Sequence, residues 1–141
     1  MSVEENKAIA RRVFEEIWNE RKLDLINKTI ATNFVRHDPA SAELSGPIGS
    51  EGYSPFINVY VSAFPDHHFD VEDMIAEGDT VVIRWTATGT HKGELAGIPP
   101  TGKKIVVPGI SIIRYANGKV VEEWSNWDTL GMMQQLGVIP R

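Results

Sequence analysis

The spacing of apolar residues changes part-way along the chain, and this change is the strongest constraint on its fold. Between residues 4 and 20 the apolar residues recur every three or four positions, which is typical of an amphipathic helix. From residue 67 onward apolar and polar residues alternate, which is typical of strands with one buried face. Helices that precede a block of strands predict an α+β fold.

The positions of glycine and proline set the expected element boundaries. Helices are predicted at 4–20, 22–30 and 51–63, and residues 33–50, which contain two prolines and two glycines, are predicted to form a loop. Strands are predicted at 67–77, 80–91, 103–115 and 119–127, followed by a short helix at 129–137. Asn117-Gly118 indicates a tight hairpin, and Pro108-Gly109 indicates a bulge in the third strand.

Together these elements predict a single domain covering residues 1–141. A long, curved, mostly antiparallel sheet packed against about three N-terminal helices would enclose a cone. Such a cone places a pocket between the concave face of the sheet and the helices.

Composition narrows the classes of function. The chain has no cysteine, which excludes disulfides, thiolate metal sites and a cysteine nucleophile. Its net charge of −5 argues against nucleic acid as a partner. The sequence has no stretch of 18 apolar residues and no signal-peptide pattern at its start, so a soluble cytoplasmic protein without membrane contact is expected. No spacing of histidines and carboxylates resembles a metal-ligand set.

Strand alternation identifies side chains that could face the pocket. On the second predicted strand, Trp85 and His91 share an apolar face. On the last strand, Trp124, Asn126 and Asp128 share one face, and an aromatic ring, an amide and an acid in a row are unusual for a solvent face. Asp128 is followed by Thr-Leu-Gly and is also a good candidate for a helix N-cap. The two interpretations of Asp128 remain open at this point.

The chain resembles the SnoaL-like group, the polyketide ester cyclases of the nuclear transport factor 2-like superfamily. The motifs that carry the resemblance are Gly89-Thr90-His91, Pro99 to Gly102, Gly118, Trp124, Asp128 and Gln135 to Gly137. The N-terminal helix and the Arg-His-Asp-Pro segment at 36–39 also match, so the resemblance covers nearly the whole chain.

This resemblance implies a cone-shaped fold, a homodimer and an intramolecular aldol ring closure that needs no metal or cofactor. In the family, the Asp that matches Asp128 acts as general base and acid on a proton next to a carbonyl. The chain departs from the family pattern at one position. The characterised cyclases commonly have a His directly before the Trp that matches Trp124, and this chain has Glu123.

A physical argument supports the same roles. An Asp128 carboxylate packed against Trp124 in an apolar cone would lose hydration, and its pKa would rise towards the range useful for proton transfer. A developing enolate would need a hydrogen-bond donor, and His37, His91 and Asn126 are the candidates, with His37 first because it lies in a predicted loop at the pocket mouth. A small hydrophobic or polycyclic ligand is expected to contact Phe14, Trp18, Trp85, Trp124 and Asn126.

Two alternatives remain. The first is a small-molecule-binding protein of the same fold without turnover, because a fold alone does not fix a function. The second is an isomerase or hydrolase on the same cone. A ketosteroid isomerase-like site needs a tyrosine and a second acid facing the base, and an epoxide hydrolase needs an Asp-Arg-Asp set. Arg84 is expected on the strand face opposite Trp85, which argues against the hydrolase.

Overall fold

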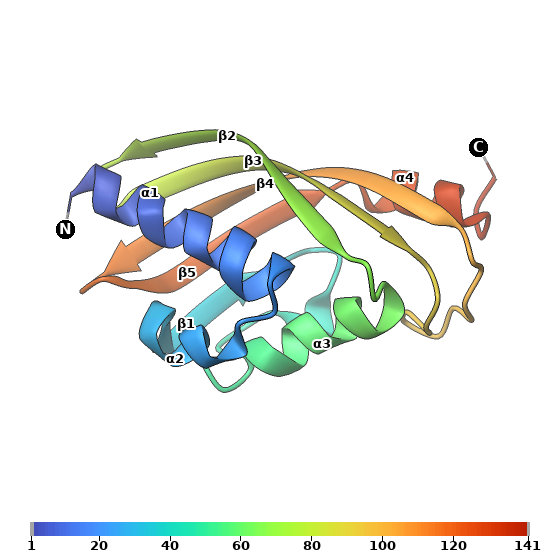
Figure 1. The fold of residues 1–141 in the computed structure, drawn as a ribbon, viewed down its shortest axis with the longest axis horizontal. Coiled ribbons are helices and arrows are strands. Elements are labelled where there is room, and N and C mark those ends of the chain that lie inside the picture. The colour runs from blue at the N-terminus through green and yellow to red at the C-terminus, as the bar shows by residue number, and fades with distance from the viewer. Residues whose placement is uncertain (1, 141) are drawn as a thin grey trace.

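The computed structural model describes residues 2–140 and shows a curved five-stranded sheet with helices along its concave side (Figure 1). The strand order is β1-β5-β4-β3-β2. The strands are β1 (Ile30–His37), β2 (His68–Glu77), β3 (Thr80–Thr90), β4 (Lys104–Ala116) and β5 (Lys119–Trp127). The α+β cone predicted from the sequence is therefore confirmed, and its sheet is mixed because β1 runs parallel to β5.

The N-terminal helix forms as predicted and is fixed at its start. α1 (Val3–Arg11) begins with a capping box, in which the Ser2 hydroxyl accepts from the Glu5 amide and the Glu5 carboxylate accepts from the Ser2 amide. The helix continues as a π-helical segment, η1 (Arg12–Asn19). This segment carries Phe14 and Trp18 into the interior, where both side chains are buried.

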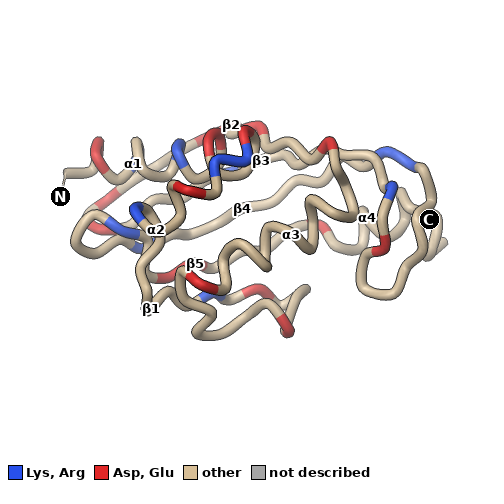
Figure 2. The backbone as a smooth tube through the Cα atoms, turned by 60° about the horizontal axis from the view of Figure 1, so that its bottom comes forward, with Lys and Arg blue, Asp and Glu red and all other residues tan. Residues whose placement is uncertain are grey.

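The remaining helices close the concave side and one end of the sheet. A single turn, η2 (Leu23–Leu25), leads into α2 (Ile26–Thr29), and η3 (Ala42–Leu44) lies in the loop before α3 (Tyr53–Ala63). α4 (Thr129–Leu136) packs on β4 and ends at Gly137, which has a left-handed conformation. No side chain of α3 is charged along its length (Figure 2). None of the helices within residues 2–140 is long and apolar enough to cross a membrane.

The loop prediction for residues 33–50 is wrong in its first part, because β1 extends to His37. The register of β1 against β5 shifts between Ile30 and Val35, and this irregularity interrupts the period-two pattern. The strand therefore lacked the alternation by which the other four were found. Its presence matters for function, because it places the 36–39 segment against β5.

The turn between β4 and β5 follows the prediction, whereas the bulge does not. Asn117 and Gly118 both have positive φ, at 52° and 77°, as a tight hairpin requires. Pro108 and Gly109 stay in continuous register with β3, so no bulge forms there. Gly109 instead allows a close approach, because a Cβ at this position would lie 2.3 Å from the ring of Trp85.

Candidate active site

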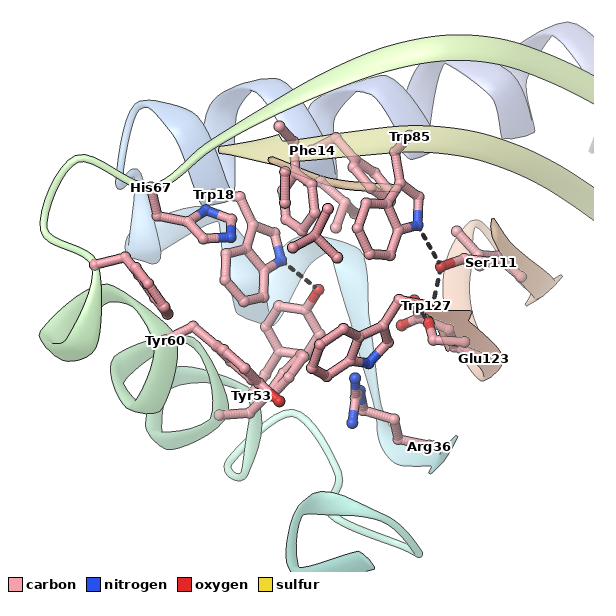
Figure 3. A pocket seen from close by; sticks show the side chains of 18 of the residues that line it. Phe14, Trp18, Arg36, Tyr53, Tyr60, His67, Trp85, Ser111, Glu123 and Trp127 are labelled. Carbon is pink, nitrogen blue, oxygen red and sulfur yellow. Dashed lines mark hydrogen bonds between the residues drawn. The ribbon is translucent and has the colours of Figure 1, made fainter. Parts of the chain in front are cut away.

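A cavity lies between the concave face of the sheet and the helices. It contains about 850 Å³ of space not filled by atoms, part of which is open to solvent. Its aromatic walls come from η1, α3 and the strands, with the side chains of Phe14, Trp18, Tyr53, Phe56, Tyr60, Trp85 and Trp127. Figure 3 shows the rings of Phe14, Trp18, Tyr53, Tyr60, Trp85 and Trp127 around one space, which a small number of polar groups reach.

The register of the sheet determines which residues of β5 face this cavity. Trp85 pairs with Gly109, which pairs with Trp127, while Ser111 pairs with Ser125. Because alternate residues share a face, Glu123 lies on the same side as Ser125 and Trp127. All three line the cavity.

A hydrogen-bond chain runs along the concave face and ends at Glu123 (Figure 3). The Trp85 indole Nε1 donates to the Ser111 hydroxyl over 3.0 Å, and the Ser111 and Ser125 hydroxyls are 2.8 Å apart. Ser125 donates to Oε2 of Glu123 over 3.0 Å.

The direction of this chain follows from its two ends. An ionised carboxylate can only accept, so the Ser125 proton points toward Glu123 and the Ser111 proton points toward Ser125, while Ser111 accepts from the indole N–H. Oε2 of Glu123 is thereby held as an acceptor. The other carboxylate oxygen, Oε1, is the one available to take a proton from a ligand.

A buried cation lies beside this carboxylate. Arg36 of β1 and Glu123 of β5 are register partners on neighbouring parallel strands, and both line the cavity. The guanidinium Nη2 of Arg36 donates to Oδ2 of Asp38 over 2.9 Å, and the Trp127 indole donates to the same oxygen over 3.0 Å. Asp38 therefore holds Arg36 and Trp127 in place together.

The rest of the Arg36 guanidinium makes no hydrogen bond to the protein. Its carbon lies 3.9 Å from the centre of the Phe56 ring, and its Nε and Nη1 are buried without a hydrogen bond. Buried donors are usually satisfied, and two free donors on one cation are well suited to an oxygen that carries negative charge.

Tyr53 supplies a further donor. Its hydroxyl accepts from the Trp18 indole over 3.1 Å, which leaves its own proton free. Burial raises the pKa of Tyr53, and the negative charge of Glu123 adds to this effect. The hydroxyl therefore stays protonated near neutral pH and can donate to a ligand.

Asp128 does not lie where the pocket interpretation placed it. Its side chain is exposed, it is not among the residues that line the cavity, and Oδ1 accepts from the Gly131 amide over 2.8 Å. It is the N-cap of α4, as the alternative interpretation held. From Glu123 to Trp127 the inward face of β5 is carried by odd-numbered residues, and the strand ends at Trp127.

The same alternation places two other expected ligand contacts outside the cavity. Trp124 and Asn126 lie on the opposite face of β5 from Glu123. His37 follows Arg36 on β1, so it also points outward. It lies 2.8 Å from Glu122 and is stacked on Trp124 at 5.1 Å. The prediction that His37 lies at the pocket mouth and donates a hydrogen bond to an enolate is therefore not supported by its position.

His91 is fully buried but does not line the cavity. Its Nδ1 accepts from the Thr101 amide over 3.2 Å, and its ring lies 5.3 Å from that of Phe64. These contacts tie the end of β3 to the loop that contains Pro99 to Gly102. By contrast, Phe14, Trp18 and Trp85 do line the cavity, as expected.

Sequence reasoning missed the polar residues that do reach the cavity. Ser111 lies in an apolar run of β4 and Ser125 lies between two tryptophans, and such isolated hydroxyls were a usable signal. Glu123 was noticed only as a departure from the family pattern. Arg36 was assigned to a loop. Within residues 2–140, no group of three histidine, aspartate or glutamate side chains could hold a metal ion.

Comparison with known proteins agrees with this architecture. The family model for SnoaL-like polyketide cyclases matches residues 8–136. Aklanonic acid methyl ester cyclase DnrD of Streptomyces peucetius is 28% identical over 135 residues, which cover 92% of this chain and 88% of DnrD.

Solved structures show the same fold. A protein of Acidithiobacillus ferrooxidans with a suggested polyketide cyclase activity has a TM-score of 0.86 and 32% identity, with 98% of this chain and 99% of the other covered. AclR of Streptomyces galilaeus, a suggested hydroxylase, has a TM-score of 0.84 and 29% identity, with 99% of this chain and 85% of AclR covered. The chain belongs to the SnoaL-like polyketide cyclase family.

Proposed function

We propose that this protein is a cyclase-type enzyme that closes a ring in an aromatic or polycyclic carbonyl compound, with Glu123 as the general base. One observation carries the proposal. The Glu123 carboxylate and the Arg36 guanidinium occupy paired positions of β5 and β1 on the wall of one aromatic cavity. A base and a fixed cation at one site are what proton removal next to a carbonyl requires.

The proposed reaction is an intramolecular aldol addition. Oε1 of Glu123 removes a proton from the carbon next to a carbonyl, and the electron pair of the broken C–H bond forms an enolate. The enolate carbon attacks a second carbonyl of the same molecule, so that a C–C bond forms and the carbonyl oxygen becomes an alkoxide. Glu123 returns its proton to that alkoxide, and the product is an isomer of the substrate.

Charge is conserved within the site during these steps. The negative charge that leaves Glu123 appears on the enolate oxygen, where the free Nε and Nη1 of Arg36 and the Tyr53 hydroxyl can donate hydrogen bonds. Asp38 holds the guanidinium beforehand, so little reorganisation is needed as the charge moves. The aromatic walls exclude water and pack against a flat ring system.

Aklanonic acid methyl ester is the first substrate to test, because DnrD is named for its cyclisation. Product formation should be followed by chromatography and proton NMR, since the product has the same mass. We expect turnover by the wild type and a kcat lower by about 10² to 10⁴ in Glu123→Gln. Asp128→Asn, in which the side chain can still cap α4, should keep the wild-type kcat. The opposite ranking of the two variants would overturn the assignment.

A carbonyl isomerase is the second candidate, and the position of Tyr53 favours it. Tyr53 lines the same cavity as Glu123, and the charge of Glu123 contributes to its raised pKa, so a tyrosine donor and a base are both present. The first chemical step would be the same. Return of the proton to a different carbon, without C–C bond formation, would distinguish the isomerase in the NMR assay. Binding without any turnover would favour the accessory binding protein.

We also propose that the protein is a homodimer joined through the convex face of the sheet. A row of side chains in register crosses that face, from Ile75 through Val82 and Ile112 to Trp124 and His37. Ile75 and Ile112 are exposed, and Ile110 lies in the next row. The ion pairs Arg84–Asp73 and Arg114–Glu122 lie on the same face, so the exposed apolar side chains form a stripe between charged groups. A stripe of this kind is typical of an interaction surface. Sedimentation should show a dimer, and Ile112→Lys should shift it to the monomer.

A further inference from the structure

A further polar group reaches the cavity, at the side away from Glu123. His67 directly precedes β2 and is 8% exposed, and it lines the same cavity. Its ring lies 5.3 Å from that of Trp18 and 4.7 Å from that of Phe69, so it forms part of the aromatic wall. Figure 3 shows it across the cavity from Glu123, beyond Trp18.

The backbone of His67 is well satisfied, whereas its ring is not. Its amide donates to the Phe64 carbonyl over 2.9 Å, and its carbonyl accepts from Arg21 over 3.2 Å. The ring Nδ1 is buried and has no hydrogen-bond partner. A phenylalanine would fill this place as well as its neighbours Phe64 and Phe69 do, without leaving a polar atom unpaired.

The ring is uncharged near neutral pH. Burial lowers the pKa of His67 to about 4, and the positive charges of Arg21 and His68 contribute to the shift. A neutral imidazole has one N–H donor and one nitrogen lone pair, so it can bind a hydroxyl or a carbonyl oxygen. It has no charge with which to attract a carboxylate.

We propose that His67 is a second binding subsite, which takes an uncharged oxygen, a hydroxyl or a carbonyl, at the distal end of an aromatic ligand. β3 and β4 separate β2 from β5, and the register places His67 level with Ile105 of β4 and Glu123 level with Ile113, so the subsite and Glu123 lie at opposite ends of the cavity. The ligand is therefore an elongated ring system with oxygen at both ends. The subsite at His67 does not depend on the proposed function. The orientation of the ligand, with its reactive carbonyl at Glu123, does rest on it.

The test uses two ligands that differ only at one end, 2-(hydroxymethyl)anthraquinone and 2-ethylanthraquinone. Binding to the full chain can be followed through the fluorescence of Trp18 and Trp85, which line the cavity. We expect the wild type to bind the hydroxymethyl compound about fivefold to tenfold more tightly than the ethyl compound. His67→Phe should remove this preference, and His67→Gln should retain part of it.

His68 provides the matched control. It is the next residue, its side chain is 52% exposed, and it lies 3.4 Å from Asp70 rather than in the cavity. His68→Phe should keep the wild-type preference. In nitrogen-15 NMR, the hydroxymethyl compound should shift the ring nitrogens of His67 and leave those of His68 in place.

Three results would overturn the subsite: an unchanged preference in His67→Phe, an equal loss in His68→Phe, or no binding of either compound to the wild type. Failure of the proposed function has a different signature. If Glu123 is not the base, Glu123→Gln keeps turnover while the ligand preference still depends on His67.

Discussion

Arg36 and Glu123 occupy paired positions on two parallel strands, yet Arg36 forms its ion pair with Asp38. Within residues 2–140, Glu123 takes part in no ion pair, and its one side-chain hydrogen bond comes from Ser125. Arg36 is thus paired with Asp38, and it lies beside Glu123 on the neighbouring strand. This division of roles leaves Glu123 free to exchange a proton, while Arg36 stays fixed to stabilise the charge that results.

The hydrogen bond from Ser125 should matter more for catalysis than for folding. Ser125→Ala removes the donor that holds Oε2 of Glu123, and we expect kcat to fall about tenfold, because the carboxylate loses its orientation. The free energy of unfolding should fall by about 1 kcal/mol for the lost buried hydrogen bond. Steady-state kinetics and urea denaturation measure the two effects. Ser62→Ala, on the exposed side of α3, is the control, and equal kcat values in both variants would refute the orienting role.

Asp128 should behave as a structural residue. Asp128→Ala removes the acceptor for the Gly131 amide, and the expected loss in the free energy of unfolding is about 1 kcal/mol. Asp128→Asn keeps a good N-cap, so its free energy of unfolding should fall by a few tenths of a kcal/mol at most. Urea denaturation of the two variants tests this ranking. If both variants are as stable as the wild type, the cap is not what Asp128 contributes.

His67 should make stability depend on pH in a defined window. Its pKa is lowered from 6.5 to about 4 in the folded protein, so below pH 6.5 the unfolded chain binds a proton that the folded protein does not. The free energy of unfolding should therefore fall by about 3 kcal/mol between pH 6.5 and pH 4.

A comparison of variants separates the contribution of His67 to the pH dependence of stability from that of the carboxylates. Urea denaturation at several pH values should show a flatter profile for His67→Phe than for the wild type, whereas His68→Phe should follow the wild type. Parallel profiles for the wild type and His67→Phe would mean that the ring is not buried in its neutral form.

The sequence predicted the architecture because the elements obey simple periodicities. β3 and β4 alternate in burial along their whole length, and the hairpin at Asn117-Gly118 has the conformation that this pair favours. β1 was not found, because a register shift interrupts its alternation. Without β1, the position of Arg36 beside β5 could not be foreseen. The expected cytoplasmic location stays a prediction from composition.

The candidate site was predicted only in part, because alternation defines two faces without saying which is buried. Trp124, Asn126 and Asp128 were chosen for their chemistry, yet Ser125 and Trp127 are turned inward by pairing with Ser111 and Gly109. That register is set by partners on β4, which a single strand does not reveal. Phe14 and Trp18 were placed correctly because helical spacing assigns a single apolar stripe to the interior.

Exchange of ligand protons with deuterated water tests the central assignment most directly, because it requires only the first chemical step. Aklanonic acid methyl ester is incubated with each protein in deuterated buffer, and loss of the proton signal next to the carbonyl is followed by NMR. The wild type and Asp128→Asn should accelerate exchange equally, and Glu123→Gln should fall to near the rate without protein. Exchange that survives in Glu123→Gln and disappears in Asp128→Asn would contradict the assignment of Glu123 as the base.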